Sequence, residues 1–411
     1  MLAERRTALV GDINFAIKGG SQESTKNMFE FGTDWFLVTP HDASSLVVNS
    51  RRTPSVKIPF SHQYLPSPME ARRVALEIER YDPEHLIINH PDFYTGSLFL
   101  ALPKSLRRRS HALWRAEVDR TTAIREERPL KAQARKAVKG IQQRMQRYVG
   151  NNVSSNLVVS EALVSSLENI GIHNNIRVIP EQIGGEFSPA VRSSEGAVHE
   201  RRKYLDDDEL GVLIVTRLSS ERGLSWLPKL IESLRKERRF ISPESPYRKL
   251  QVAVAGQIID GQEEYVARVM EEINAVVDRT GDIRHADSIT FRYLGKFDRV
   301  GLQKIYNAYD VLFHPSPSDG FGRVAVEAMS AGMTVITRTD NKAASEIIQN
   351  PPYAVGDIVD SPEELARRLL HQMQDSELLR SLQQQALRWA SGHYSLKTAE
   401  EMFWNALSGQ M

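Results

Sequence analysis

The chain has 411 residues, of which 41% are hydrophobic and 26% are charged, and it contains no cysteine. This length suffices for two domains, or three, each with a hydrophobic core of its own. The 53 basic residues almost cancel the 52 acidic ones, which argues against a protein specialised for binding bulk nucleic acid or another polyanion. The lack of cysteine excludes disulfides, thiolate nucleophiles, iron–sulfur clusters and cysteine-ligated zinc.

The first residues pass from charge to a short apolar run and reach Gly11-Asp12 too early for the apolar region of a secretory signal peptide. The longest apolar runs elsewhere fall far short of the ~20 residues that a membrane-spanning helix needs. We therefore expect a cytoplasmic protein, either free in solution or peripheral at the inner face of the membrane.

Short apolar segments alternate along the chain with helical periodicity, a pattern typical of parallel sheets flanked by helices. The segments form two series, separated by a turn-rich and then charged stretch at 187–209. The first series predicts strands at residues 7–10, 35–38, 86–89, 157–159 and 177–179. The second predicts strands at residues 212–215, 250–255, 289–293, 311–314 and 334–337. This organisation predicts an α/β fold of two doubly wound parallel-sheet domains, residues 1–195 and 196–390, which face a deep cleft.

One segment departs from the neutral average, because residues 101–150 hold 14 basic residues and 4 acidic ones. Within it, residues 130–149 have the apolar period of a helix whose other face is basic. Two interpretations remain open. The apolar stripe packs on the sheet and the charges are solvated, or the basic face binds an anionic membrane or a phosphorylated acceptor. Nucleic acid is the least favoured partner, because no aromatic stacking platform accompanies the charges.

The stretch with the clearest chemistry follows the predicted strand 311–314. There His314-Pro-Ser-Pro-Ser-Asp-Gly-Phe-Gly322 leads into a predicted helix at 323–331. Gly320 and Gly322 allow the backbone to approach an anion, and the helix start directs N–H groups and the positive end of its dipole toward that anion. Asp319 and Glu327 add two carboxylates that can accept hydrogen bonds from sugar or ribose hydroxyls. The pattern therefore favours a nucleotide-sugar site.

This stretch resembles the carboxylate–seven residues–carboxylate motif of retaining GT-B glycosyltransferases similar to glycosyltransferase family 4, the glycosyl transferases group 1. Other segments resemble the family in the same order, namely Lys18-Gly-Gly-Ser21, Thr216-Arg-Leu-Ser-Ser-Glu-Arg-Gly223, Ala255-Gly256 and Tyr293-Leu-Gly-Lys-Phe297. The resemblance implies the GT-B fold, with a Rossmann-like acceptor-binding domain followed by a Rossmann-like nucleotide-sugar-binding domain. It also implies that a C-terminal helix, within residues 391–411, crosses back to the first domain.

The resemblance further implies roles for the matching residues. Asp319 would hold the sugar hydroxyls and Glu327 the ribose, and with His90 they form the expected catalytic set. The expected contacts of the donor diphosphate are Gly19, Gly20, Arg217, Arg222, Gly320, Phe321 and Gly322. Those of the nucleotide are Gly256, Lys296 and Phe297.

His90 is chosen because the family often has a histidine at a strand end of the first domain. His90 ends the predicted strand 86–89, whereas the strand near 111–118 is followed by acidic residues, Glu117 and Asp119. A histidine at a strand end is more often a structural residue than a catalytic one, so this assignment has the least support.

Three positions depart from the family pattern. Asp319 stands where the family usually has Glu, which shortens the reach toward the sugar by one methylene. Arg222 replaces the usual Lys, so the phosphate-binding pair is all arginine, which keeps the charge but changes the geometry. Pro180-Glu-Gln-Ile-Gly184 replaces the common Pro-Asn-Gly-Val-Asp. Donor preference is therefore open between uridine and guanosine diphosphate sugars.

The expected reaction is the transfer of a hexose from a nucleotide diphosphate sugar to a hydroxyl acceptor, with formation of an α-glycosidic bond. The arginines and loop amides would stabilise the leaving diphosphate, so we expect no metal and no cofactor besides the donor substrate. A nucleotide-sugar epimerase or hydrolase of the same fold and a non-catalytic nucleotide-sugar-binding protein are the alternatives. The acceptor itself stays open. We also expect Glu327→Ala to leave the fold intact, on the premise that Glu327 lies at the surface.

Overall fold

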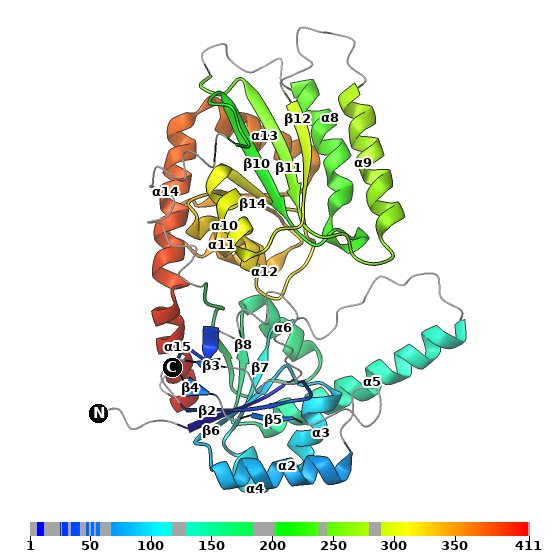
Figure 1. Cartoon of the computed structure of the whole chain (residues 1–411), viewed down its shortest axis with the longest axis vertical. Helices are drawn as coiled ribbons and strands as arrows, with labels where there is room; N and C mark the ends of the chain where they lie inside the picture. The colour runs from blue at the N-terminus through cyan, green and yellow to red at the C-terminus, as the bar shows by residue number, and fades with distance from the viewer. Residues whose placement is uncertain are drawn as a thin grey trace. The chain divides into compact units, whose positions relative to one another are not determined.

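The computed structural model describes residues 6–11, 25, 27–31, 34–41, 47–48, 51–52, 55–57, 67–116, 129–183, 201, 203–237, 245–278 and 289–409. Contacts within the chain divide it into two compact units (Figure 1). Unit 1 comprises Met1–Gln182 and Leu396–Met411, and unit 2 comprises Ile183–Ser395. Our predicted boundary after residue 195 lies outside the described residues.

The core of unit 1 is a seven-stranded parallel sheet in the order β5-β2-β1-β6-β7-β8-β9. The chain winds first to one side of β1 and then to the other, which is the doubly wound topology. A short antiparallel ladder joins β3 (Val47–Val48) to β4 (Arg51–Arg52). The sheet strands are β1 (Arg6–Val10), β2 (Asp34–Thr39), β5 (Ser55–Lys57), β6 (His85–Asn89), β7 (Ser110–Trp114), β8 (Ser155–Val158) and β9 (Ile176–Val178).

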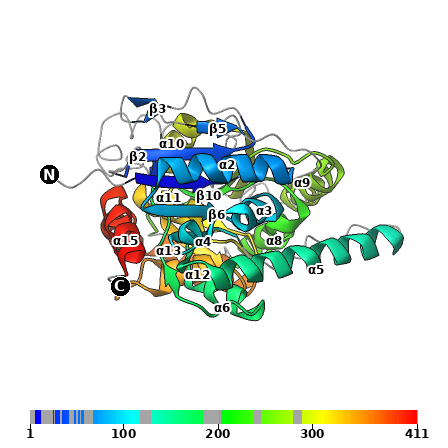
Figure 2. The ribbon, with the colours of Figure 1, turned by 90° about the horizontal axis from the view of Figure 1, so that it is seen from below.

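Helices connect the strands from β5 to β9, and local signals in the sequence mark where two of them begin. Ser67 caps the first by accepting a hydrogen bond from the Glu70 N–H, and Asp92 with Thr95 forms a capping box at the second. Figure 2 shows α2, α3 and α5 beside one another along the sheet. The connecting helices are α2 (Pro68–Tyr81), α3 (Phe93–Ala101), α4 (Lys104–Arg107), α5 (Pro129–Asn152) and α6 (Glu161–Asn169).

The last helix, α15 (Leu396–Ser408), packs on unit 1 although it follows unit 2 in the chain. The buried ring of Phe403 lies 5.3 Å from that of Phe31, and Trp404 lies 6.2 Å from His85. Arg177, in β9, donates a hydrogen bond to the Ala406 carbonyl. These contacts join the C-terminus to the sheet of unit 1.

Unit 2 is built on a six-stranded parallel sheet in the order β12-β11-β10-β13-β14-β15. Its strands are β10 (Glu209–Val215), β11 (Lys249–Ala255), β12 (Ile289–Gly295), β13 (Val311–His314), β14 (Thr334–Arg338) and β15 (Gly356–Val359). Its helices are the short η3 (Ser220–Arg222) and η4 (Leu224–Trp226), then α8 (Leu227–Glu237), α9 (Glu263–Asp278), α10 (Arg299–Ala308), α11 (Arg323–Ser330), α12 (Lys342–Gln349), α13 (Pro362–Gln374) and α14 (Ser376–His393).

All ten predicted strands coincide with observed ones, because buried parallel strands are continuous apolar runs. The strand near 111–118 is observed as β7 and ends at Trp114; Glu117 and Asp119 lie outside the described residues. Two edge strands, β5 and β15, were not predicted, since they are short and only partly apolar. Among the described helices, none has both the length and the apolar character to cross a bilayer.

A buried histidine on β7, His111, lies beside the partly buried His85 of β6. His85 Nδ1 lies 3.2 Å from His111 Nε2, and His111 Nδ1 lies 2.7 Å from Ser155 Oγ. Burial lowers the pKa of His111 to about 3, and the neighbouring His85 and Arg177 act in the same direction. His111 is therefore neutral in the folded chain at neutral pH.

Acid should destabilise unit 1 through His111. Its pKa is about 3 when folded and 6.5 ordinarily, so the unfolded chain binds more protons between these values and stability falls as the pH drops below 6.5. At pH 5 the protonation of His111 in the unfolded chain should lower the free energy of unfolding by about 2 kcal/mol. Urea unfolding at pH 7 and pH 5 should show that loss for the wild type and not for His111→Gln. Equal losses in both proteins would contradict the assignment.

Candidate functional site

Three loops meet at the carboxyl edge of the sheet in unit 2. They follow β10, β13 and β14, and β13 lies between the other two strands. The carboxyl ends of parallel strands face one edge, so side chains on these loops converge. The loops carry Arg217 and Arg222 after β10, Asp319 after β13, and Asn341 after β14.

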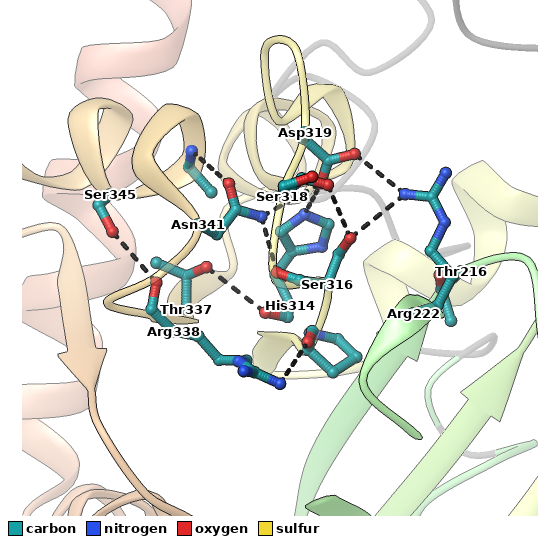
Figure 3. A network of polar contacts seen from close by, with 12 residues as sticks. Thr216, Arg222, His314, Ser316, Ser318, Asp319, Thr337, Arg338, Asn341 and Ser345 are labelled. Atoms are coloured by element: carbon teal, nitrogen blue, oxygen red, sulfur yellow. Dashed lines mark hydrogen bonds and ion pairs between the residues drawn. The ribbon is translucent and has the colours of Figure 1, made fainter. Parts of the chain in front are cut away.

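The Asp319 carboxylate is held by donors from all three loops (Figure 3). Its Oδ2 lies 2.5 Å from His314 Nε2 and accepts a hydrogen bond from Asn341 Nδ2 at 3.2 Å. Its Oδ1 accepts a hydrogen bond from Arg222 Nη1, also at 3.2 Å. Since a carboxylate only accepts, the His314 Nε2 carries the proton of that contact. The Asp319 side chain remains 21% exposed, so a hydroxyl can still reach it.

Opposing effects set the pKa of Asp319. Burial raises it, but the charge and hydrogen bond of His314, the charge of Arg222 and the hydrogen bond from Asn341 together lower it to about 2. Asp319 is therefore ionised at neutral pH and can accept hydrogen bonds from hydroxyls without giving up a proton.

Asn341 was not singled out from the sequence. Its buried side chain caps α12, because Oδ1 accepts the Ala344 N–H at 3.1 Å, while Nδ2 donates to Asp319 and to the Ser316 carbonyl. An asparagine directly before a helix is a recognisable cap signal. That signal would have located the cap, whereas the contact with Asp319 depends on the tertiary fold.

Arg222 reaches Asp319 because two loops touch at a glycine. Gly223 has φ 73°, and a Cβ there would lie 1.9 Å from the Pro315 carbonyl oxygen. Only glycine permits this approach. Arg222 Nη1 also donates to Ser316 Oγ at 3.2 Å, whereas Arg217 is exposed on the same loop. Of the expected basic pair, the structure thus brings Arg222 to the motif.

The motif loop turns into α11 at Gly322. This residue has φ 89°, in the left-handed region, and as a glycine it offers no side chain to cap the helix start. Such a start concentrates backbone N–H groups and the positive end of the dipole beside Gly320, the arrangement that suits a phosphate. Phe321 is buried, with its ring 5.7 Å from that of Tyr394. The side chain of Phe321 therefore anchors the loop, and only its backbone can face a diphosphate.

Our premise that Glu327 lies at the surface is wrong. Glu327 is 5% exposed, because α11 is enclosed by β13, β14, α12 and α14. Its Oε1 lies 3.0 Å from Arg323 Nε and 3.6 Å from Arg299 Nη1, and its Oε2 accepts a hydrogen bond from Tyr306 Oη at 3.2 Å. Burial and the Glu327 charge raise the pKa of Tyr306 well above its usual value, so the phenol stays protonated and donates.

The expected nucleotide contacts lie at neighbouring strand ends. Gly256 follows β11, and a Cβ there would lie 1.7 Å from the Thr216 carbonyl oxygen. Tyr293 Oη donates to the Gly256 carbonyl at 2.9 Å. Lys296, which is exposed, and Phe297, which is partly buried, follow β12. Adjacent strands β10, β11 and β12 thus place these residues along the same edge as the Arg222 loop.

His90 lies in unit 1, directly after β6, and has φ 51°, which is uncommon for a residue other than glycine. Burial lowers the pKa of His90; Asp92 opposes this effect and Arg115 adds to it. No described group hydrogen-bonds its Nδ1. The catalytic role of His90 stays a prediction. Gly19 and Gly20 lie outside the described residues.

Comparison with known proteins agrees with the motif. Residues 198–389 match the model of the family Glycosyl transferases group 1. These residues are a glycosyl transferases group 1 domain. The domain covers most of unit 2 and contains Arg222, Asp319 and Glu327. A curated relative, the uncharacterized glycosyltransferase MJ1607 of Methanocaldococcus jannaschii, is 26% identical over 175 residues, which are 42% of this chain and 38% of the relative.

Solved structures match both units of the chain. Anabaena Alr3699/HepE in complex with UDP and glucose has a TM-score of 0.69 at 15% identity, covering 99% of this chain and 100% of that one. The sucrose-phosphate synthase of Thermosynechococcus elongatus has a TM-score of 0.71 at 17% identity, covering 99% of each chain. At these identities the likeness shows the fold, and the expected GT-B fold of two Rossmann-like units is confirmed.

Removing the carboxylate of Glu327 should destabilise the glycosyl transferases group 1 domain. Glu327→Ala leaves the guanidinium groups of Arg323 and Arg299 without their shared counter-charge, a loss of roughly 3 kcal/mol. Glu327→Gln keeps the shape of the side chain and should lower the free energy of unfolding by less. Thermal unfolding measures both, with Glu271→Ala, an exposed acid on α9, as a control that should change little. Wild-type stability of Glu327→Ala would contradict the buried charge cluster.

Replacing His314 should raise the pKa of Asp319. In His314→Leu the charge and hydrogen bond that lower it are gone, while the burial that raises it remains. Carbon NMR of protein with labelled aspartate carboxyls, with the Asp319 signal assigned through Asp319→Asn, follows the titration. His371→Leu, an exposed position on α13, should leave the value at about 2. A His314→Leu titration like that of the wild type would show that the contact with His314 does not lower the pKa of Asp319.

Proposed function

We propose that this chain is a retaining glycosyltransferase, which moves a hexose from a UDP- or GDP-sugar to a hydroxyl acceptor and forms an α-glycosidic bond. One observation carries the proposal: the ionised Asp319 carboxylate lies beside Arg222, on the glycine-containing loop that leads into the start of α11. An acceptor for sugar hydroxyls and a cation for a phosphate therefore adjoin one another. The match of this segment to glycosyl transferases group 1 supports the same chemistry.

The leaving group is the nucleoside diphosphate. In the proposed reaction the bond between sugar C1 and the β-phosphate oxygen breaks, and C1 bonds to the acceptor oxygen on the same face. The acceptor's proton passes to the departing phosphate, so no side-chain base is required. Arg217, Arg222 and the amides of Gly320–Gly322 are proposed to stabilise the charge that develops on that phosphate.

The two carboxylates of the motif are proposed to position the donor. Asp319 would accept hydrogen bonds from the sugar hydroxyls. Glu327 would hold the ribose through Oε2, which accepts one hydrogen bond from Tyr306 and, like any carboxylate oxygen, has a second lone pair. His90, at the carboxyl edge of the other sheet, is proposed to face the sugar. A uridine nucleotide has support from the Anabaena protein, which was solved with UDP and glucose.

The proposed mechanism uses neither a metal nor an additional cofactor, because arginines and backbone amides carry the positive charge. Activity should therefore survive dialysis against a chelator.

Donor binding can be tested by thermal shift with UDP, UDP-glucose and GDP-mannose. A ligand at 100 times its dissociation constant adds ~2.7 kcal/mol to the free energy of unfolding. For a nucleotide that binds, Arg222→Ala should lower the affinity about tenfold or more. The control Arg380→Ala, which replaces an exposed arginine on α14, should not lower it. Asp319→Asn should weaken the nucleotide sugar more than the free nucleotide, because this carboxylate is assigned to the sugar.

Turnover separates the proposed transferase from the alternatives. With radiolabelled donor and no acceptor, full conversion of the donor would identify an epimerase or hydrolase. Nucleotide binding without turnover on any pool of acceptors would identify a binding protein. NMR of a product should show the α-anomer, and a β-anomer would overturn the retaining mechanism.

A further inference from the structure

Exposed apolar side chains gather on one part of unit 1. Of the eight large hydrophobic residues that are exposed among the described residues, four lie on α3 and α5. The last turns of α5 pack on α3 rather than on the sheet: Val149 is buried, and Met145 lies against Gly96 of α3. Further toward its amino-terminal end, Ile141 is 55% exposed and Val138 is 52% exposed. The four residues are Leu100, Val138, Ile141 and Tyr148.

These residues form a connected surface together with arginines. Ile141, Arg144 and Tyr148 lie on one side of α5, at spacings of three and four residues. Arg107 joins α4 to this side, because its guanidinium donates to Tyr148 Oη at 3.3 Å and to the Leu100 carbonyl. We call the set Leu100, Arg107, Val138, Ile141, Arg144 and Tyr148 the α5 surface. Figure 1 shows the amino-terminal end of α5 extending beyond α2 and α3.

The helices that carry the α5 surface are basic. Helices α3, α4 and α5 contain eight basic residues and no acidic one. The neighbouring α2 differs, because its three glutamates balance its three arginines. Leu76, on α2, is 48% exposed and thus resembles Ile141 in exposure but not in the charge around it.

We propose that the α5 surface docks on an anionic lipid bilayer. Basic side chains attract acidic headgroups, and exposed aliphatic side chains enter the boundary between headgroups and acyl chains. Tyr148 suits the same boundary, because its ring is apolar and its hydroxyl polar. Nucleic acid offers the same negative charge, but it leaves Leu100, Val138 and Ile141 without an apolar partner. The combination of basic charge and exposed aliphatic groups therefore selects a membrane.

Vesicle flotation tests the docking directly. The full chain should float with vesicles of phosphatidylcholine and phosphatidylglycerol, and not with phosphatidylcholine alone, and rising salt should weaken the binding. Ile141→Gln with Arg144→Gln should lower the partition coefficient about tenfold or more. The matched control, Leu76→Gln with Arg380→Gln, should bind like the wild type. Absence of flotation, equal flotation with both lipids, or an equal loss in the control pair would overturn the proposal.

A single label identifies which surface meets the lipid. The chain contains no cysteine, so Ile141→Cys and Leu76→Cys can each carry one environment-sensitive fluorophore. Anionic vesicles should shift the emission of the label at 141 to the blue and leave that at 76 unchanged. The opposite pattern, or tighter binding to single-stranded RNA than to vesicles, would refute the assignment. These experiments use neither donor nor acceptor, so their outcome is independent of the proposed transferase activity.

Discussion

The site in unit 2 depends on a close backbone contact between two loops. Because Gly223 has no side chain, the loop after β10 lies directly against the Pro315 carbonyl at the end of β13. This contact brings the guanidinium of Arg222 to the carboxylate of Asp319. Gly256 allows a similar approach to the Thr216 carbonyl, directly after the neighbouring strand β10. Any side chain at Gly223 would separate the loops and with them the opposite charges of the site.

The two carboxylates of the motif have different surroundings. The Asp319 carboxylate lies in a network of hydrogen bonds and stays partly exposed. Glu327, by contrast, is enclosed together with Arg299, Arg323 and Tyr306. Both are fixed before any ligand arrives, so binding requires little reorganisation of charge. Glu327 also stabilises the domain through its ion pairs, and for this reason a loss of activity in its variants reports on chemistry only when stability is measured alongside.

Much of the fold could be predicted from the sequence because long buried strands are apolar and parallel strands alternate with helices. The motif could also be predicted, because its glycines and carboxylates lie close together in the chain. The burial of Glu327, the role of Asn341 and the exposure of Ile141 could not be predicted, because each depends on elements distant in sequence. Strand β15 was not predicted because it is short and has few apolar residues. It begins with Gly356, which lies against the Val335 carbonyl.

The position of α15 has a consequence for the order in which the units can fold on the ribosome. Unit 2 is one continuous segment, so all its residues have been synthesised before α15 begins. Unit 1 requires Phe403 and Trp404 to cover Phe31 and His85. The unit that is synthesised first is therefore completed last, because part of its surface stays uncovered until α15 has been synthesised.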